Sequence, residues 1–213
     1  MKPSEEVAKI LLKIKAVELR PNKPFKYVSG ILSPIYTDNR LLMSHPKERR
    51  RVVELLANKV KKIGKPDVIA GTATAGIPHA AWIAEKLNSP MIYTRSQVKV
   101  HGKGRQVEGE LKKGQSVIIV EDLVSTGKSG LETLAVIKEA GGKCKDVVAI
   151  FSYELPQSFE NYKKAKANLN VLCTLKELVD VAIKTSYIKE KDKEIVLDWA
   201  KDPVGWGRRA GFE

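Results

Sequence analysis

Cysteine is scarce in this sequence: Cys144 and Cys173 are the only two among 213 residues. Both stand in strand-like apolar runs, KCKDVVAIF and NVLCTL, where a cysteine usually serves as a small core hydrophobic residue. This usage argues against a disulfide framework and against a cysteine metal site.

Long apolar runs are absent as well. No window approaches 18 uncharged apolar residues, the length that indicates a membrane-spanning helix. The first ten residues, MKPSEEVAKI, lack the basic-then-apolar layout of a secretion signal. We therefore expect a cytoplasmic protein that has no membrane partner.

Aromatic residues make up only 6% of the chain, whereas Lys and Arg number 38 against 25 Asp and Glu, a net charge of +13. Such a field attracts anions of any kind, including RNA, membrane surfaces and phosphorylated metabolites. RNA-binding modules usually combine basic with aromatic side chains, and no recognisable nucleic-acid module is present. Much of the excess charge lies along expected helices, as in residues 46–65, where it suits a solvated face. No nucleic-acid partner is expected.

What the chain does contain is an alternation of apolar strand-like runs and helical patterns. Helices are expected at 3–16, 46–63, 78–87, 131–142 and 158–167, with a C-terminal helix at about 188–202. Strands are expected at 67–71, 91–94, 116–122, 146–153 and 170–175, with two small strands within 25–38. The polar, glycine-bearing segment 95–114 is interpreted as a long loop.

Strands that are apolar throughout and alternate with helices predict an α/β fold, in which helices flank a central parallel sheet. We expect a single domain over residues 1–213. Within it, a small N-terminal subdomain lies mainly in 1–45, and the sheet core occupies about 46–185.

The most informative segment is VIIVEDLVSTGKSG, residues 117–130. A buried strand that ends in Glu121 and Asp122 brings two carboxylates to the carboxyl edge of the sheet, where open α/β folds bind ligands. The chain then turns through 125–129 directly into a helix, so backbone N–H groups, hydroxyls and a helix N-terminus suit a phosphate. An ordinary capped strand-to-helix turn leaves the acid pair unexplained. A Walker A loop fails because only one glycine closely precedes Lys128.

This segment resembles the type I phosphoribosyltransferases, whose signature for phosphoribosyl pyrophosphate matches Val117 to Ser129. Three further segments resemble the orotate phosphoribosyltransferases within that family. Residues 25–40 match the hood near the base, 69–87 the pyrophosphate loop and 93–109 the catalytic loop. The resemblance implies the type I phosphoribosyltransferase fold and transfer of a phosphoribosyl group to orotate, giving orotidine 5′-monophosphate and pyrophosphate in pyrimidine biosynthesis. It also implies a homodimer with shared active sites, and Mg²⁺ that enters with the pyrophosphate substrate.

The resemblance assigns roles to the residues of the signature. Glu121 and Asp122 would hold the ribose hydroxyls, and 125–129 would bind the 5′-phosphate. The whole implied stretch is Glu121, Asp122, Leu123, Val124, Ser125, Thr126, Gly127, Lys128 and Ser129.

Other implied contacts lie outside the signature. The pyrophosphate would be bound by Thr74, Ala75 and Gly76, and by Arg95, Lys99 and His101 of the catalytic loop. The implied catalytic residues are Lys99, His101 and Asp122, and the implied orotate contacts are Ser125, Tyr36 and Arg40. Four residues depart from the family pattern, at two places in the chain. Ser96 and Gln97 replace a second loop lysine, and Ser152 and Tyr153 stand where many members have an arginine.

The chemistry of the implied reaction needs these residue types. Displacing pyrophosphate from C1 of ribose builds positive charge on the sugar and negative charge on the leaving group, so cations belong around the phosphates and acids below the ring. The loop residues Arg95, Lys99 and His101 supply the cations, although a merely solvated basic loop remains an alternative. His45 and His79, by contrast, suit packing or capping.

Two alternatives to this function remain. A purine phosphoribosyltransferase would share the signature but should lack SGILSPIYTDNR, residues 29–40. A nucleic-acid-binding regulator could keep the phosphoribosyl pyrophosphate site as a sensor, and the net charge of +13 favours it.

Overall fold

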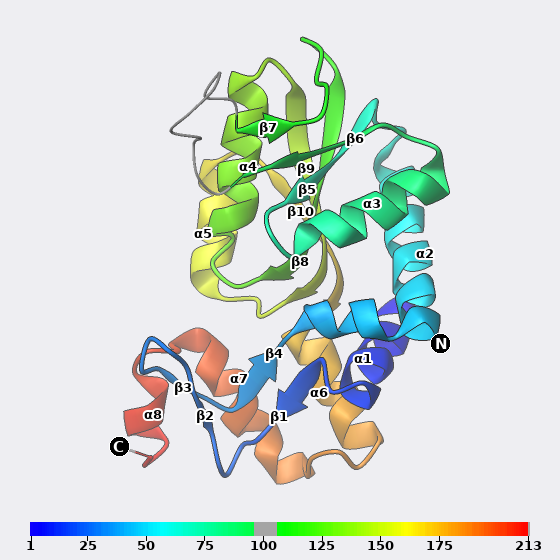
Figure 1. The fold of residues 1–213 in the computed structure, drawn as a ribbon. Helices are drawn as coiled ribbons and strands as arrows, with labels where there is room; N and C mark the ends of the chain where they lie inside the picture. The colour runs from blue at the N-terminus through cyan, green and yellow to red at the C-terminus, as the bar shows by residue number, and fades with distance from the viewer. Residues whose placement is uncertain (96–105, 213) are drawn as a thin grey trace.

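The computed structural model describes residues 1–95 and 106–212, and its architecture is shown in Figure 1. Its centre is a six-stranded sheet in the order β10-β9-β8-β5-β6-β7. The strands are β5 (Val68–Thr72), β6 (Met91–Thr94), β7 (Val107–Glu108), β8 (Ser116–Val124), β9 (Lys143–Ser152) and β10 (Asn168–Thr174). The sequence predicted five of them, with end points that differ by up to three residues.

The sheet is mixed rather than wholly parallel. Neighbouring strands from β10 to β6 run parallel, but β7 pairs antiparallel with β6, where Tyr93 faces Glu108. The predicted central parallel sheet is therefore confirmed from β10 to β6, and β7 adds a short antiparallel strand at its edge. β7 is only two residues long and half-buried, so no apolar run distinguishes it from the loop that the sequence predicted there.

Helices cover both faces of the sheet (Figure 1). The helices of the described residues are α1 (Pro3–Lys13), α2 (Pro46–Ile63), α3 (Gly76–Leu87), α4 (Lys128–Glu139), α5 (Pro156–Lys164), α6 (Leu175–Lys184), α7 (Lys193–Lys201) and α8 (Trp206–Arg209). The last two lie away from the sheet (Figure 1). Two 3₁₀ turns are also present: η1 (Asn39–Ser44) precedes α2, and η2 (Glu190–Asp192) lies between α6 and α7. No described helix is long and apolar enough to cross a membrane.

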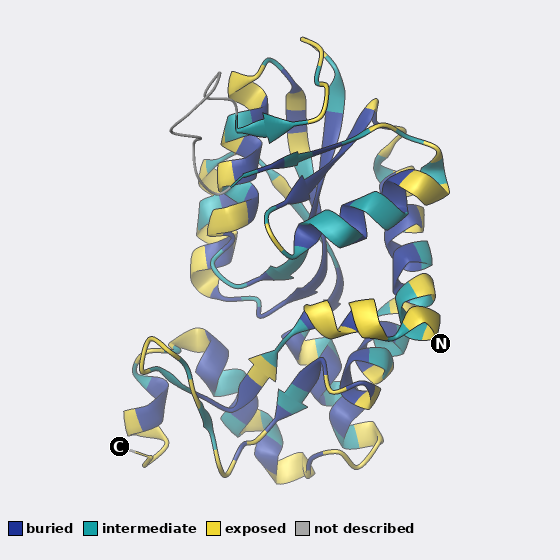
Figure 2. Ribbon diagram, viewed as in Figure 1, coloured by how far each residue is buried: buried dark blue, intermediate teal, exposed yellow. Residues whose placement is uncertain are grey.

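The core has one layer on each face of the sheet. Along β8, Val117 and Ile119 pack in the layer beneath α4, whereas Ile118 and Val120 pack in the larger layer that includes α1, α2, α3 and α6. Successive strand residues point to opposite faces, so an uninterrupted apolar run is what a doubly covered strand needs. Figure 2 shows the resulting buried strands and the exposed outer sides of the helices. Cys144 and Cys173 are buried and free, as the sequence predicted.

The N-terminal strands form two small antiparallel pairs, β1 (Val17–Leu19) with β4 (Ile35–Thr37), and β2 (Phe25–Lys26) with β3 (Leu32–Ser33). Figure 1 places them together with α7 and α8 at one end of the molecule. Aromatic rings join these segments to the sheet. Trp199 of α7 lies 6.5 Å from Tyr27 and 5.1 Å from Tyr153, measured between ring centroids. Packing of this kind fixes the N-terminal strands beside the carboxyl edge of the sheet.

Candidate active site

Two acids lie near the carboxyl end of the central strand β8, which continues past them to Val124 and so is longer than the sequence predicted. Glu121 is buried, with 5% of its surface exposed, and Asp122 is half-buried. The Asp122 backbone N–H donates to Glu121 Oε1 at 3.0 Å. Asn39 of η1 reaches across from the N-terminal region and donates from Nδ2 to the Asp122 carbonyl oxygen at 2.8 Å. The acid pair is therefore held at the junction of the sheet and the N-terminal strands.

The environment of this pair opposes full ionisation. Burial, and then the neighbouring Asp122 charge, raises the pKa of Glu121 to about 9. Burial also raises the pKa of Asp122, while the nearby Arg40 guanidinium acts in the opposite direction. Glu121 is consequently protonated at neutral pH, and a ligand that offers hydroxyl groups can both donate to this pair and accept from it.

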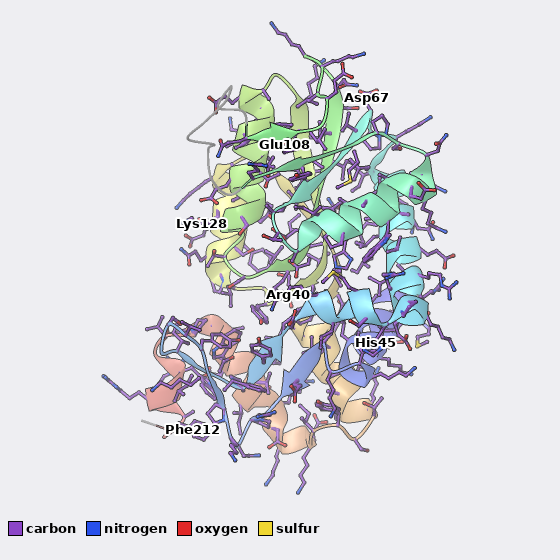
Figure 3. The ribbon with its side chains drawn as sticks, in the orientation of Figure 1. Arg40, His45, Asp67, Glu108, Lys128 and Phe212 are labelled. Carbon is purple, nitrogen blue, oxygen red and sulfur yellow. The ribbon has the colours of Figure 1, made fainter. Side chains whose placement is uncertain are left out.

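The loop after β8 leads straight into α4. Gly127 occupies the N-cap position of α4 with φ +80°, a left-handed conformation that glycine adopts readily. Within the described part of the chain, no side chain caps this helix, so its first N–H groups face the loop. Lys128 and Ser129 are exposed, and Lys128 Nζ lies 3.8 Å from Glu132 Oε1 (Figure 3). A helix N-terminus with free N–H groups is suited to binding an anion.

A second turn of the same kind lies beside the first. β5 is parallel to β8 and next to it, and its chain continues through Thr74 and Ala75 into α3 at Gly76. A Cβ on Gly76 would overlap the Val120 carbonyl oxygen, and a Cβ on Gly71 would lie 2.8 Å from Ile77 Cα. These glycines let α3 approach the sheet closely. Thr74 is exposed in this turn.

Arg95 follows the end of β6 at the same edge. Its Nε lies 2.7 Å from Glu108 Oε1, and its backbone N–H donates to the Gln106 carbonyl at 2.9 Å. A cavity of about 370 Å³ is lined by residues of the β5 turn, the β6 end and α4, including Ala73, Arg95, Ser129 and Thr133. The structure thus brings Arg95 to the same cavity as Ser129. Lys99 and His101, as well as Ser96 and Gln97, lie outside the described residues.

The residues predicted near the base have other partners in this structure. Arg40 makes a two-point contact with Asp38, at 2.6 Å from Nε and 2.9 Å from Nη2. This guanidinium holds the pKa of Asp38 below its usual value. Figure 3 shows Arg40 at the junction between the sheet and the N-terminal strands. Tyr36 is 41% exposed, and its ring lies 5.5 Å from that of Phe25.

Two further positions have packing roles. His79 is completely buried, and its ring meets that of Trp82 edge-on at 5.5 Å. Burial lowers the pKa of His79 to about 4, so the side chain is neutral and packs in the core as the sequence predicted. Tyr153, which is one of the four residues that depart from the family pattern, is also buried, against Phe151 and Trp199.

Sequence reasoning did not single out Asn39, although this residue ties the acid strand to the N-terminal region. Its side chain is buried, and its Oδ1 has no hydrogen-bond partner among the described residues. Asn39 and Asp122 are 83 positions apart in the chain, so no local pattern could have predicted the contact. The available signal was a polar residue two positions before the apolar LLM of η1.

Comparisons with known proteins agree with this geometry. Residues 41–171 match the family described as "Phosphoribosyl transferase domain". A protein named orotate phosphoribosyltransferase from Coxiella burnetii is 48% identical over 97% of this chain and 99% of its own length.

Solved structures show the same fold. Orotate phosphoribosyltransferase from Aeropyrum pernix matches with a TM-score of 0.72 and 27% identity, over 86% of this chain and 99% of that one. Leishmania donovani UMP synthase matches with a TM-score of 0.78 and 30% identity over 92% of this chain, which spans 42% of that longer protein. On the family match and the identity to full-length relatives, the chain belongs to the phosphoribosyl transferase family and, within it, to the orotate phosphoribosyltransferases.

Proposed function

We propose that this chain transfers the phosphoribosyl group of phosphoribosyl pyrophosphate to orotate, giving orotidine 5′-monophosphate and pyrophosphate in pyrimidine biosynthesis. The observation that carries the proposal is the acid pair Glu121–Asp122 flanked by two helix N-termini, in a chain 48% identical to an orotate phosphoribosyltransferase. One edge of the sheet thus offers two acids that can bind ribose hydroxyls. It also offers the N–H groups of two helix N-termini, which can bind the 5′-phosphate and the pyrophosphate.

The residue roles form part of this proposal. Glu121 and Asp122 accept hydrogen bonds from the ribose 2′ and 3′ hydroxyls, and Asp122 supplies negative charge below the sugar as C1 becomes cationic. The loop 125–129 binds the 5′-phosphate through its backbone N–H groups and the N-terminus of α4. The turn 74–76 binds the pyrophosphate through its backbone.

Cations complete the proposed site on the pyrophosphate side. Arg95 lies at the cavity beside the β5 turn, and Lys99 and His101 are assigned to the same task on sequence grounds. These groups stabilise the charge that develops on the leaving pyrophosphate. Ser125, Tyr36 and Arg40 are proposed to contact orotate.

We expect Mg²⁺ to bind at this edge of the sheet together with the pyrophosphate substrate. The described residues hold no group of three or more His, Cys, Asp or Glu side chains that could cage a metal ion. Mg²⁺ prefers phosphate oxygens, water and one or two carboxylates, which matches a pyrophosphate bound above the Glu121–Asp122 pair. Bound there, the ion would neutralise charge on the leaving group.

Two further parts of the proposal concern organisation. We propose a homodimer in which the segment containing Lys99 completes the partner's site, and we place the reaction in the cytoplasm. We also propose that the chain forms one domain, with the N-terminal strands acting as a hood over the base.

The test is a reaction of the purified protein with phosphoribosyl pyrophosphate, Mg²⁺ and orotate, followed by orotate absorbance and pyrophosphate release. We expect one pyrophosphate for each orotate consumed, and no consumption of adenine or hypoxanthine. Consumption of a purine base instead of orotate would support a purine phosphoribosyltransferase. Binding of phosphoribosyl pyrophosphate without turnover of any base would support a sensor.

A further inference from the structure

Helix α5 lies directly against the loop that follows β8, and two adjacent residues make the contact. Asn161 Nδ2 donates to the Thr126 carbonyl oxygen at 3.0 Å. The Tyr162 ring packs under Gly127, where a Cβ would lie 2.5 Å from its Cε2 atom. Both contacts link α5 to residues 35 positions earlier in the chain.

Tyr162 also meets the first turn of α4. A Cβ on Gly130 would lie 2.9 Å from Tyr162 Oη and 4.0 Å from Glu121 Oε2, so the tyrosine hydroxyl and the buried acid lie close to the same glycine. Between these two distances lies Val147 Cγ1, at an ordinary contact distance of 3.6 Å. The hydroxyl therefore sets how closely α4 approaches α5.

The hydroxyl of Tyr162 is costly to the fold. The residue is 4% exposed, and within the described chain its Oη has no hydrogen-bond partner. A buried polar group without a partner costs free energy of folding that a phenylalanine at the same position would not cost. A structural role for the ring alone does not account for the oxygen atom, and each such buried group needs its own explanation.

We propose that Asn161 and Tyr162 are positioning residues for phosphate binding: they hold residues 126–130 in the shape that directs the loop's N–H groups toward the 5′-phosphate of phosphoribosyl pyrophosphate. This inference rests on the proposed function, in which loop 125–129 binds that phosphate. Asn161 fixes the carbonyl of Thr126, the Tyr162 ring fixes Gly127, and the Tyr162 hydroxyl fixes Gly130. Neither side chain is assigned a contact with substrate.

The first test compares Asn161→Ala and Tyr162→Phe with the wild-type protein. Each variant should raise the KM for phosphoribosyl pyrophosphate about three- to tenfold and leave the KM for orotate unchanged within about twofold. Asn161→Ala loses one hydrogen bond, and Tyr162→Phe loses the hydroxyl that holds Gly130 in place. Tyr162→Phe should melt at the wild-type temperature or above it, because it removes an unpaired buried hydroxyl. Phe159→Ala is the matched control, since Phe159 is on the same helix and 58% exposed. It should change neither KM.

The second test uses Gly130, which the proposal places outside the phosphate loop. Gly130→Ala puts a methyl group 2.9 Å from Tyr162 Oη and should raise the same KM by about tenfold or more. Adding Tyr162→Phe removes the opposing atom, so the double variant should recover to the KM of Tyr162→Phe alone within about twofold. If the two substitutions act independently, their fold increases in the KM for phosphoribosyl pyrophosphate multiply in the double variant instead.

Wild-type KM for phosphoribosyl pyrophosphate in both Asn161→Ala and Tyr162→Phe would overturn the proposal. The proposal would also be overturned if both KM values rose equally and in parallel with a fall in melting temperature, because this would indicate a merely structural role. Calorimetric titration of phosphoribosyl pyrophosphate into the same variants separates this inference from the proposed function. If the wild-type protein makes no orotidine 5′-monophosphate but its affinity for phosphoribosyl pyrophosphate still falls in the variants, only the proposed function fails.

Discussion

At the scale of single residues, Glu121 shows how the fold sets the chemistry of one carboxyl group. Burial and Asp122 raise its pKa from 4.5 to about 9. Over the pH range between these values the folded protein keeps a proton that the unfolded chain releases. Stability linked to this group is therefore fully present below the unfolded pKa and is lost as pH rises toward the folded one.

The variant Glu121→Gln tests this reasoning. A neutral amide avoids the cost of ionising a buried acid, so the melting temperature of the variant should exceed that of the wild type at pH 8 by several degrees, about 2–4 °C for each kcal/mol. The difference should shrink at pH 5, which is close to the unfolded pKa of 4.5, because the unfolded chain gains much less free energy there by releasing the proton. Melting curves at the two pH values check it. A difference that is larger at pH 5 would show that the pKa of Glu121 is not raised.

Residue roles were only partly accessible from the sequence. Glu121 and Asp122 were predicted to end a strand at the ligand edge because both signals, an apolar run and an acid pair, are local. Asn39, Asn161 and Tyr162 were not singled out, since their contacts join segments 83 and 35 positions apart or pack against glycines. Side chains whose task is to support a loop carry no local pattern of their own.

At the scale of elements, the turn from β5 into α3 depends on close approach. Gly76 is buried, and any side chain there would overlap the Val120 carbonyl oxygen of β8. Gly76→Ala should therefore push α3 away from the sheet and cost about 1–3 kcal/mol of stability. Because the same turn is proposed to bind pyrophosphate, kcat/KM for phosphoribosyl pyrophosphate should fall as well. Thermal melting with steady-state kinetics tests both effects, and a variant with wild-type values in both would contradict this placement.

Elements with a strong local pattern were predicted well. Both α2 (Pro46–Ile63) and β6 (Met91–Thr94) have the predicted bounds. The separate helix α6 (Leu175–Lys184) was not predicted, although Thr174 and Glu177 form a capping box, a pattern that indicates the start of a helix. β1 is only three residues long and is stabilised by pairing with β4, in which Thr37 faces Val17 and Ile35 faces Leu19. Short strands of this kind depend on a distant partner rather than on their own sequence.

At the scale of the whole molecule, the proposed homodimer makes a prediction about mixed subunits. Lys99→Ala and Asp122→Asn proteins should each be inactive or nearly so. If one chain's Lys99 completes the partner's site, exchange of subunits should restore about a quarter of wild-type activity, because half the dimers are mixed and each has one intact site of two. A mixture that stays inactive despite measured subunit exchange would place both residues in the same chain's site.

Two aspartates on neighbouring strands, one toward the carboxyl ends of the strands and one toward their amino ends, allow a direct comparison. Asp122 lies near the carboxyl end of β8, whereas Asp146 lies in the first half of β9 and accepts a hydrogen bond from Asn168 at 2.8 Å. Both aspartates are half-buried on neighbouring parallel strands, so they experience similar packing but lie toward opposite edges. Substituting each aspartate in turn therefore distinguishes the loss of a site residue from general damage to the sheet.

The most direct test of where the chemistry occurs is therefore kcat/KM for phosphoribosyl pyrophosphate in Asp122→Asn and Asp146→Asn, measured in parallel with orotate as acceptor. Asp122→Asn should lower it by a factor on the order of ten to a thousand, since it removes negative charge below the developing cation. Asp146→Asn should stay within about twofold of wild type, as expected for a substitution away from the site. Wild-type kcat/KM in Asp122→Asn, or an equal loss in the two variants, would contradict an active site at the carboxyl edge.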